Sequence, residues 1–178
     1  DFDRDMRIFL LDFPNNEVKR GFLTLVANNY LNTKENISST VQELVIALKR
    51  GDPDRFREQL TSFLASIPYS MRRKENEREH ERYFHYTFYL ILRLISVYTV
   101  FTEKQQSRGR VDCIVETDRY VYIFEFKLDG TATAALQQID DKGYATPYSS
   151  DGRTIYKIGV NFSSETGTVD GWECVLDK

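Results

Sequence analysis

The chain has 178 residues and a net charge of −3, with 41% hydrophobic and 29% charged residues. This composition is typical of a globular domain and excludes a disordered chain. The slightly acidic balance excludes a generally basic nucleic-acid coat protein but leaves room for a local basic groove. No apolar run is long enough to cross a membrane. The two cysteines have neither metal-site nor disulfide spacing, so we expect a reducing, cytoplasmic setting.

Residues 1–70 are predicted to form an N-terminal helical segment. Ser39 is suited to cap a helix, and Gly51 is suited to stop it. Asp52 as a cap, with Pro53 at the first helical position, predicts the start of the next helix. The expected elements of this segment are a strand over 6–13 and helices over 14–31, 39–49 and 53–67.

The apolar periodicity changes in the second part of the chain, residues 71–178. Residues 72–96 predict one long helix with a charged first half and an apolar, buried second half. Further on, apolar residues recur at every second position, which indicates strands. The expected elements are strands over 97–102, 111–117, 120–127, 154–162 and 171–176, and a helix over 131–141. This order indicates an α/β domain in which helices flank a mixed β-sheet.

Two of these strands are predicted to form a hairpin around a two-residue turn at Asp118-Arg119. This turn sets Asp112 opposite Glu125, and Arg110 opposite Lys127, on one face. The other face is wholly apolar and is expected to meet a core. It carries Val111, Cys113, Val115, Tyr122, Phe124 and Phe126.

The opposed carboxylates of Asp112 and Glu125 predict a cation site. Their Cβ atoms would lie roughly 4.5–5.5 Å apart, where like charges are destabilising. Burial raises that cost unless the charges find a partner. Two carboxylates, waters and phosphate oxygens form the usual ligand set of Mg²⁺. Lys127 points to the same side as Glu125 and could stabilise charge on a phosphate. The alternative is a solvated charge ladder in a shifted register.

The same residues resemble a known motif. Asp112, followed about a dozen residues later by Glu125-Phe126-Lys127 on a strand, resembles the motif of the PD-(D/E)XK nuclease superfamily. Four blocks in order are similar to a bacterial branch of that superfamily, namely GRVD at 109–112, VYIFEFK at 121–127, ALQQIDDKGY at 135–144 and IGVNF at 158–162. Members of that branch commonly carry an AAA-ATPase-like domain ahead of the nuclease-like domain. Residues 11–18 (LDFPNNEV) look like the junction.

The resemblance implies a restriction-endonuclease-like fold and a phosphodiesterase that uses Mg²⁺ or Mn²⁺. Asp112 and Glu125 would hold the metal, and Lys127 would act as the base-like residue. A glutamine after the motif strand often faces the site in this superfamily and could hold a water or a phosphate. Gln138 is our choice for that role, with Gln137 as the rival.

A glutamate on the long helix often completes the metal site of this superfamily. We expect Glu81, which shares a helix face with Phe84, His85 and Phe88 at i+3, i+4 and i+7. The alternative is a surface glutamate on a charged half-helix. The rival glutamates nearer the solvated end are Glu77 and Glu79.

Basic side chains gather on the charged half of the long helix and in the segment after it, where they could flank a phosphate backbone if the helix borders the end of the sheet. Interspersed glutamates weaken that interpretation. These residues are Arg72, Arg73, Lys74, Arg78, Arg82, Lys104, Arg108 and Arg110. The chain contains no Gly-rich phosphate loop, so an ATPase would have to lie outside it.

We therefore expect a metal-dependent nuclease domain that hydrolyses nucleic-acid phosphodiesters, with DNA as the expected partner. The second hypothesis is a catalytically silent nuclease-like module that binds nucleic acid or a partner and regulates an attached AAA-type ATPase. The presence of Asp112, Glu125 and Lys127 together favours the enzyme. The sequence predicts no oligomeric state.

Overall fold

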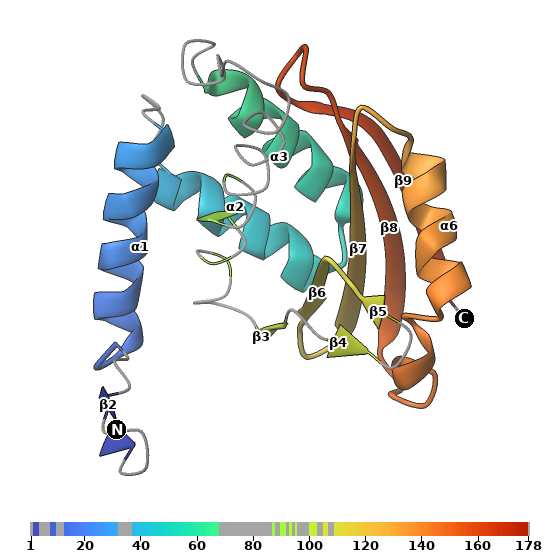
Figure 1. The fold of residues 1–178 in the computed structure, drawn as a ribbon, viewed down its shortest axis with the longest axis horizontal. Coiled ribbons are helices and arrows are strands. Elements are labelled where there is room, and N and C mark those ends of the chain that lie inside the picture. Colours follow the sequence, from blue (N-terminus) through green and yellow to red (C-terminus); the bar gives the residue numbers. More distant parts are fainter. Residues whose placement is uncertain are drawn as a thin grey trace.

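The protein is described here from a computed structural model, in which helices lie on both faces of a β-sheet (Figure 1). It describes residues 13–31, 37–67 and 111–177, the helical positions 87, 90, 91, 93 and 95, and strand segments at 2–3, 8–9, 100–102, 105–106 and 109–110. In this described part, no helix is long and apolar enough to cross a membrane.

Three helices form the N-terminal part: α1 (Asn16–Leu31), α2 (Ile37–Arg50) and α3 (Pro53–Ser66). The Asp52 side chain caps α3 as predicted, because its Oδ1 accepts a hydrogen bond from the Arg55 N–H at 3.0 Å. The prediction of Ser39 as the cap of α2 is wrong, since α2 begins at Ile37. Ile37 is buried in the core, so packing extends the helix past the local capping signal.

Of the strand predicted over 6–13, the described residues Ile8–Phe9 form β2, and most of the others lie outside the described residues. The strand β2 pairs with β1 (Phe2–Asp3) in a two-residue antiparallel ladder. Most of the predicted long helix over 72–96 lies outside the described residues. Its described positions are helical, and Ile91 and Ile95 are buried as expected for the apolar half.

The central sheet has the strand order β3-β6-β7-β8-β9. The strands β7 and β8 are parallel, and the other neighbours are antiparallel, so the predicted mixed sheet flanked by helices is confirmed. The elements of this half are β3 (Val100–Thr102), β4 (Gln105–Gln106), β5 (Gly109–Arg110), β6 (Cys113–Glu116), β7 (Tyr120–Leu128), α6 (Ala132–Lys142), the 3-10 turn η1 (Thr146–Tyr148), β8 (Thr154–Phe162) and β9 (Val169–Asp177).

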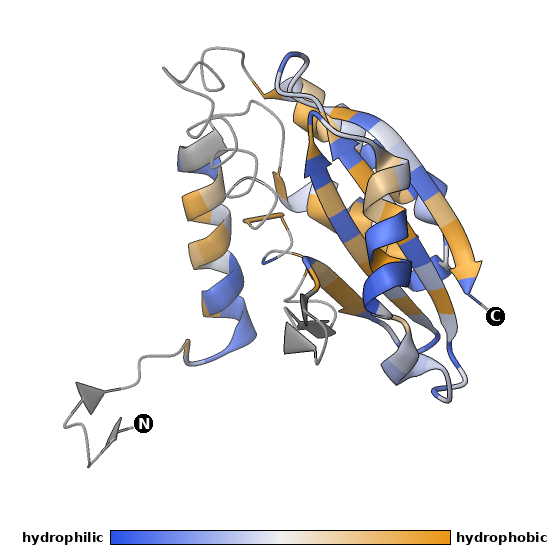
Figure 2. Ribbon diagram, turned by 45° about the vertical axis from the view of Figure 1, so that its right-hand side comes forward, coloured by the Kyte–Doolittle hydropathy of each residue, from blue (hydrophilic) through white to orange (hydrophobic). Residues whose placement is uncertain are grey.

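Each face of the sheet has its own core. The larger core joins α2 and α3 to the sheet, and the smaller one lies between the sheet and α6. Figure 2 shows the alternation of hydrophobic and hydrophilic residues along the strands. The Tyr122 hydroxyl donates to the Leu48 carbonyl at 2.7 Å, which ties the end of α2 to β7. The helices α2 and α3 thus pack on the sheet, while the division of the chain near residue 70 stays a prediction.

The predicted register of the hairpin is confirmed, since Cys113 pairs with Phe124 and Glu116 with Val121. Two details are wrong. Val111 packs in the core beneath α6, on the other face from Cys113. Arg110 pairs with Gln105 in a separate two-residue ladder instead of lying opposite Lys127. Both errors have one cause. The chain bends at Asp112, before β6 begins, so strict alternation does not extend past that residue.

Candidate active site

Two carboxylates meet where β6 begins beside β7. Glu125 lies on β7, which has a neighbouring strand on each side, and only 2% of this residue is exposed. Asp112 lies in the bend just ahead of β6, and its Oδ2 accepts a hydrogen bond from the Phe126 N–H at 2.9 Å. The backbone of β7 therefore fixes Asp112 next to Glu125.

The helix α6 approaches the sheet most closely at Gly159, which pairs with Glu125 in the parallel ladder of β7 and β8. A Cβ atom on Gly159 would lie 2.2 Å from the Ala132 carbonyl oxygen and 2.6 Å from the Leu136 nitrogen. Only glycine permits this approach. It brings Gln138, on the following turn of α6, over the charged end of β7.

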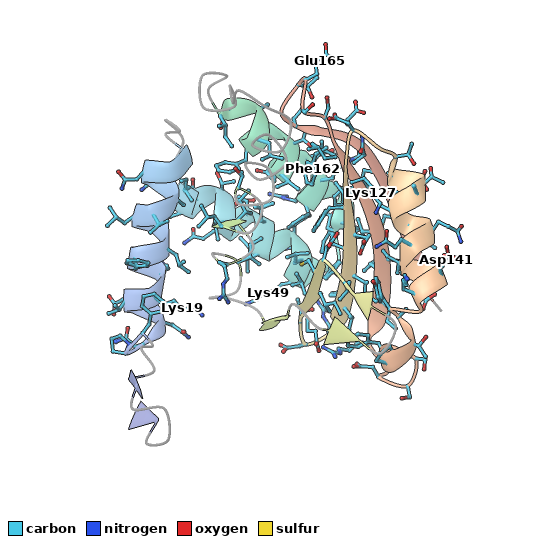
Figure 3. All side chains as sticks on the ribbon, in the orientation of Figure 1. Lys19, Lys49, Lys127, Asp141, Phe162 and Glu165 are labelled. Atoms are coloured by element: carbon cyan, nitrogen blue, oxygen red, sulfur yellow. The ribbon has the colours of Figure 1, made fainter. Side chains whose placement is uncertain are left out.

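The side chain of Gln138 joins Lys127 to Glu125. The Lys127 ammonium donates to the Gln138 Oε1 at 2.6 Å, and the Gln138 Nε2 donates to the Glu125 Oε1. Both residues of β7 thus face α6, and Figure 3 labels Lys127 on the sheet beside that helix. The predicted set of Asp112, Glu125, Lys127 and Gln138 is gathered at one place.

One oxygen of this network has no hydrogen-bond partner among the described residues. Among the described residues, no donor reaches the buried Oε2 of Glu125. A buried carboxylate oxygen without a hydrogen bond is costly, because it has lost water and gained nothing in return. This carboxylate oxygen, close to the charge of Asp112, is therefore suited to a cation as its partner.

The pKa of Glu125 reflects this environment. Burial, and then the nearby charge of Asp112, raise the pKa of Glu125 from 4.5 to about 7. The Lys127 ammonium, the Asp112 backbone N–H and the Gln138 amide each lower the pKa without cancelling the rise. A bound cation would favour the ionised carboxylate, since opposite charge stabilises the charged form.

The donors present fit Mg²⁺ or Mn²⁺ with a partly hydrated shell. Mg²⁺ commonly takes one or two carboxylates and keeps several waters, which matches Asp112 and the open oxygen of Glu125. Within the described residues, no group of three His, Cys, Asp or Glu side chains is arranged to hold a metal. Glu81 and its rivals Glu77 and Glu79 lie outside the described residues, so a third carboxylate stays a prediction.

Sequence reasoning did not identify Tyr144 as a site residue. Tyr144 is buried in the core beneath α6, the helix that carries Gln138. Burial and the carboxylates of Glu125 and Asp112 raise the pKa of Tyr144. The sequence did contain a signal for its position: Gly143 suits the left-handed residue that ends a helix and reverses the chain.

The basic side chains on and after the predicted long helix lie outside the part whose side chains are described.

Comparison with known proteins agrees with this architecture. The family model of the PD-(D/E)XK nuclease superfamily matches residues 79–172, more than half of the chain. The chain is 32% identical over 166 residues to an uncharacterized protein in the vnfD 5′ region of Azotobacter chroococcum mcd 1. That alignment covers 92% of this chain and 32% of the relative, so the chain spans about a third of the relative's length. No solved structure matches the chain. With its restriction-endonuclease-like fold, the chain belongs to the PD-(D/E)XK nuclease superfamily.

Proposed function

We propose that this chain is a divalent-metal-dependent nuclease domain that hydrolyses phosphodiester bonds of nucleic acid, with DNA as the expected substrate. The observation that carries the proposal is the buried Oε2 of Glu125, for which no hydrogen-bond partner lies among the described residues. Glu125 lies near Asp112 and is linked to Lys127 through the side chain of Gln138. Family membership supports nucleic acid as the partner.

Asp112 and Glu125 are the residues proposed to hold Mg²⁺ or Mn²⁺. Such an ion, when bound, polarises a phosphoryl oxygen and lowers the pKa of a coordinated water. Hydrogen bonds within the protein already hold both carboxylates in place. Asp112 is held by the Phe126 N–H through its Oδ2. Glu125 is held by Gln138 through its Oε1, and its buried Oε2 has no hydrogen-bond partner among the described residues.

Lys127 is proposed to stabilise the negative charge that develops on the phosphate in the transition state. Its ammonium has three protons, and the Gln138 Oε1 accepts one of them. The others remain for a phosphate oxygen or an attacking water. The Gln138 contact fixes the direction of the side chain before substrate binds, and preorganised donors of this kind are the effective ones.

Cleavage of a panel of single- and double-stranded DNA and RNA, with and without Mn²⁺, tests the proposal. We expect the parent protein to cut only with the metal and Glu125→Gln to lose at least about 10²-fold in rate. Glu173→Gln is the matched control, because Glu173 is an acid on β9 whose carboxylate accepts from the Thr133 hydroxyl. A parent protein that cuts nothing in the panel, or Glu125→Gln at parental rate, contradicts the proposal.

A regulatory module is the second candidate, and one observation favours it. The alignment covers only 32% of the Azotobacter relative, so most of that relative lies outside the part that matches this chain. In that case the site would bind nucleic acid or a partner without cleavage and would regulate an attached AAA-type ATPase. The cytoplasmic setting expected from the cysteines applies to both candidates.

A further inference from the structure

Asn161 is a buried polar side chain next to Lys127 in the sheet. The two residues are paired in the parallel ladder of β7 and β8, two positions beyond the pair of Glu125 and Gly159. Because paired residues of neighbouring strands share a face, Asn161 lies on the face from which Lys127 reaches α6. Only 3% of Asn161 is exposed, so its amide group needs hydrogen-bond partners within the protein.

Both ends of the Asn161 amide have such partners. Its Oδ1 accepts a hydrogen bond from the Gly130 N–H at 2.8 Å, and its Nδ2 donates to the Asp170 Oδ2 at 3.4 Å. A backbone N–H only donates and an ionised carboxylate only accepts, so a flipped amide would lose both bonds. The shorter of the two bonds holds Gly130, which lies in the turn between β7 and α6.

This turn lies against the stem of Lys127. A Cβ atom on Gly130 would lie 3.1 Å from the Lys127 Cβ, 3.5 Å from the Lys127 Cγ and 3.7 Å from the Asn161 Oδ1. The backbone at Gly130 therefore packs beside the first two carbon atoms of the lysine side chain while Asn161 holds it there. Beyond these atoms the ammonium extends to Gln138, whose Oε1 accepts its hydrogen bond at 2.6 Å.

A second set of bonds holds the same turn at Asp129. The Asp129 N–H donates to the Phe162 carbonyl at 2.8 Å, and the Asp129 carboxylate accepts from the N–H and the hydroxyl of Ser164 at 2.9 and 2.6 Å. Asp129 has a φ of 53°, a left-handed conformation that costs free energy in a residue other than glycine. The turn keeps this conformation because hydrogen bonds hold it on both sides, at Asp129 and at Gly130.

We propose that Asn161 is a positioning residue that holds the turn at Gly130 against the Lys127 stem and so directs the Lys127 ammonium toward Gln138 and the substrate phosphate, an inference that rests on the proposed function. Asn161 acts through Gly130 and Lys127, and it is assigned neither to the metal nor to the substrate. A displacement of about 1 Å in a group that acts on the transition state costs up to about 10²-fold in rate.

Three variants separate this role from a general loss of stability. Asn161→Ala removes the acceptor of the Gly130 N–H. Asp129→Gly loosens the same turn without changing Asn161, and it should fold because glycine favours a φ of 53°. Thr168→Val is the matched control, since it removes a part-buried hydrogen bond to the Thr61 carbonyl of α3 that involves neither the turn nor α6.

The first measurement uses the metal-free protein and needs no activity. The side-chain NH₂ signals of Gln138 are identified in ¹H–¹⁵N spectra by their loss in Gln138→Ala, and they report on the bond that Lys127 donates to this amide. We expect Asn161→Ala and Asp129→Gly to shift these signals in the direction in which Lys127→Ala shifts them, with parental signals in Thr168→Val. Parental signals in both turn variants, or in Lys127→Ala, would overturn the proposal. If Asn161→Ala does not fold, Asp129→Gly decides.

The second measurement separates the position of Lys127 from that of the metal. We expect Asn161→Ala to lose about 10-fold to 10²-fold in kcat for cleavage, to keep Mn²⁺ affinity close to the parent value in calorimetry, and to cause no further loss in the Lys127→Ala background. A role limited to anchoring the start of α6 would instead weaken Mn²⁺ binding through Gln138 and Glu125, and that result would overturn the proposal. If the parent cleaves no nucleic acid, the proposed function fails, whereas the spectra still decide whether Asn161 positions Lys127.

Discussion

The Lys127 ammonium lies near Glu125, and it donates its hydrogen bond to Gln138 rather than to an acid. We expect Lys127→Ala to lose about 10²–10³ in cleavage rate, because a preorganised donor to the transition state is removed. Mn²⁺ affinity, measured by calorimetry, should stay close to the parent value. Lys127→Arg should restore little activity, since a planar guanidinium does not replace a compact ammonium. Parental cleavage by Lys127→Ala contradicts the assigned role.

The raised pKa of Glu125 predicts a pH dependence of stability in metal-free buffer. Between its ordinary value of 4.5 and about 7, Glu125 keeps its proton in the folded protein and loses it in the unfolded chain. The folded state then binds more protons, so this group makes the free energy of unfolding fall as pH rises through that window. The groups that face Glu125 are Asp112, Lys127, Gln138 and Tyr144.

Denaturant unfolding from pH 4 to 8 measures this effect as the difference between the parent and Glu125→Gln. We expect the variant to gain on the order of 2 to 3 kcal/mol relative to the parent as pH rises through the window. Saturating Mn²⁺ should reduce or reverse the trend in the parent, because metal binding needs the ionised carboxylate. If the difference in the free energy of unfolding between the two proteins does not change with pH, the claim that Glu125 is a buried carboxylate with a raised pKa is contradicted.

For individual residues, prediction from the sequence succeeded where one local turn sets the geometry. The two-residue turn fixes which residues of the hairpin oppose each other, so the pairing of 113–116 with 121–124 followed from counting. Asp112 lies beyond that ladder and is held beside β7 by the Phe126 N–H. It failed for Val111 and Arg110, because no residue type in that stretch signals the bend at Asp112. Tyr144 was missed because its position depends on a reversal that helical periodicity does not describe.

At the level of elements, the contact of α6 with β8 determines where Gln138 lies. The start of α6 is anchored by Asn161, whose Oδ1 accepts from the Gly130 N–H at 2.8 Å. The Lys157 ammonium binds Asp140 near the other end of the helix at 2.7 Å. Gly159 lies under the helix between these anchors and leaves no room for a side chain.

Gly159→Ala should therefore disturb both stability and the site. The added Cβ would meet backbone atoms of α6, which cannot move aside as a flexible side chain can. We expect a loss of about 1–3 kcal/mol in the free energy of unfolding, as is typical of overpacking, together with weaker Mn²⁺ binding. Gly21→Ala is the control, since nothing lies within 4 Å of a Cβ there and alanine favours the helix. Unchanged stability and Mn²⁺ affinity in Gly159→Ala would rule out this close approach.

Capping signals predicted the helix ends unevenly. Asp52 and Pro53 gave the start of α3 because both act within one turn. The end of α2 before Gly51 was also predicted correctly, since Gly51 has a φ of 76° that favours glycine. Ser39 failed because burial of Ile37 continues the helix toward its N-terminus, and burial depends on the tertiary fold.

For the whole molecule, one five-stranded sheet joins the candidate site to both cores. Hydrophobic periodicity predicted the strands and the covering helices, because each face of the sheet packs against apolar residues. It did not predict that the N-terminal helices α2 and α3 share their core with β7, since contacts distant in sequence leave no periodic signal. The paired carboxylates come from β7 and from the bend ahead of β6, so only the folded protein brings them together to bind a ligand.

Thermal unfolding with and without Mn²⁺ therefore tests the central claim most directly. A cation that binds only the folded state stabilises it by mass action, by about 2.7 kcal/mol at a concentration one hundred times its Kd. We predict that Mn²⁺ raises the Tm of the parent protein and that Asp112→Asn, which removes one charge of the opposed pair, abolishes most of that rise. Without metal, the same variant should be at least as stable as the parent, because repulsion of Glu125 is relieved. An equal rise in both proteins, or a metal-free Asp112→Asn protein less stable than the parent, would contradict a metal site built on Asp112 and Glu125.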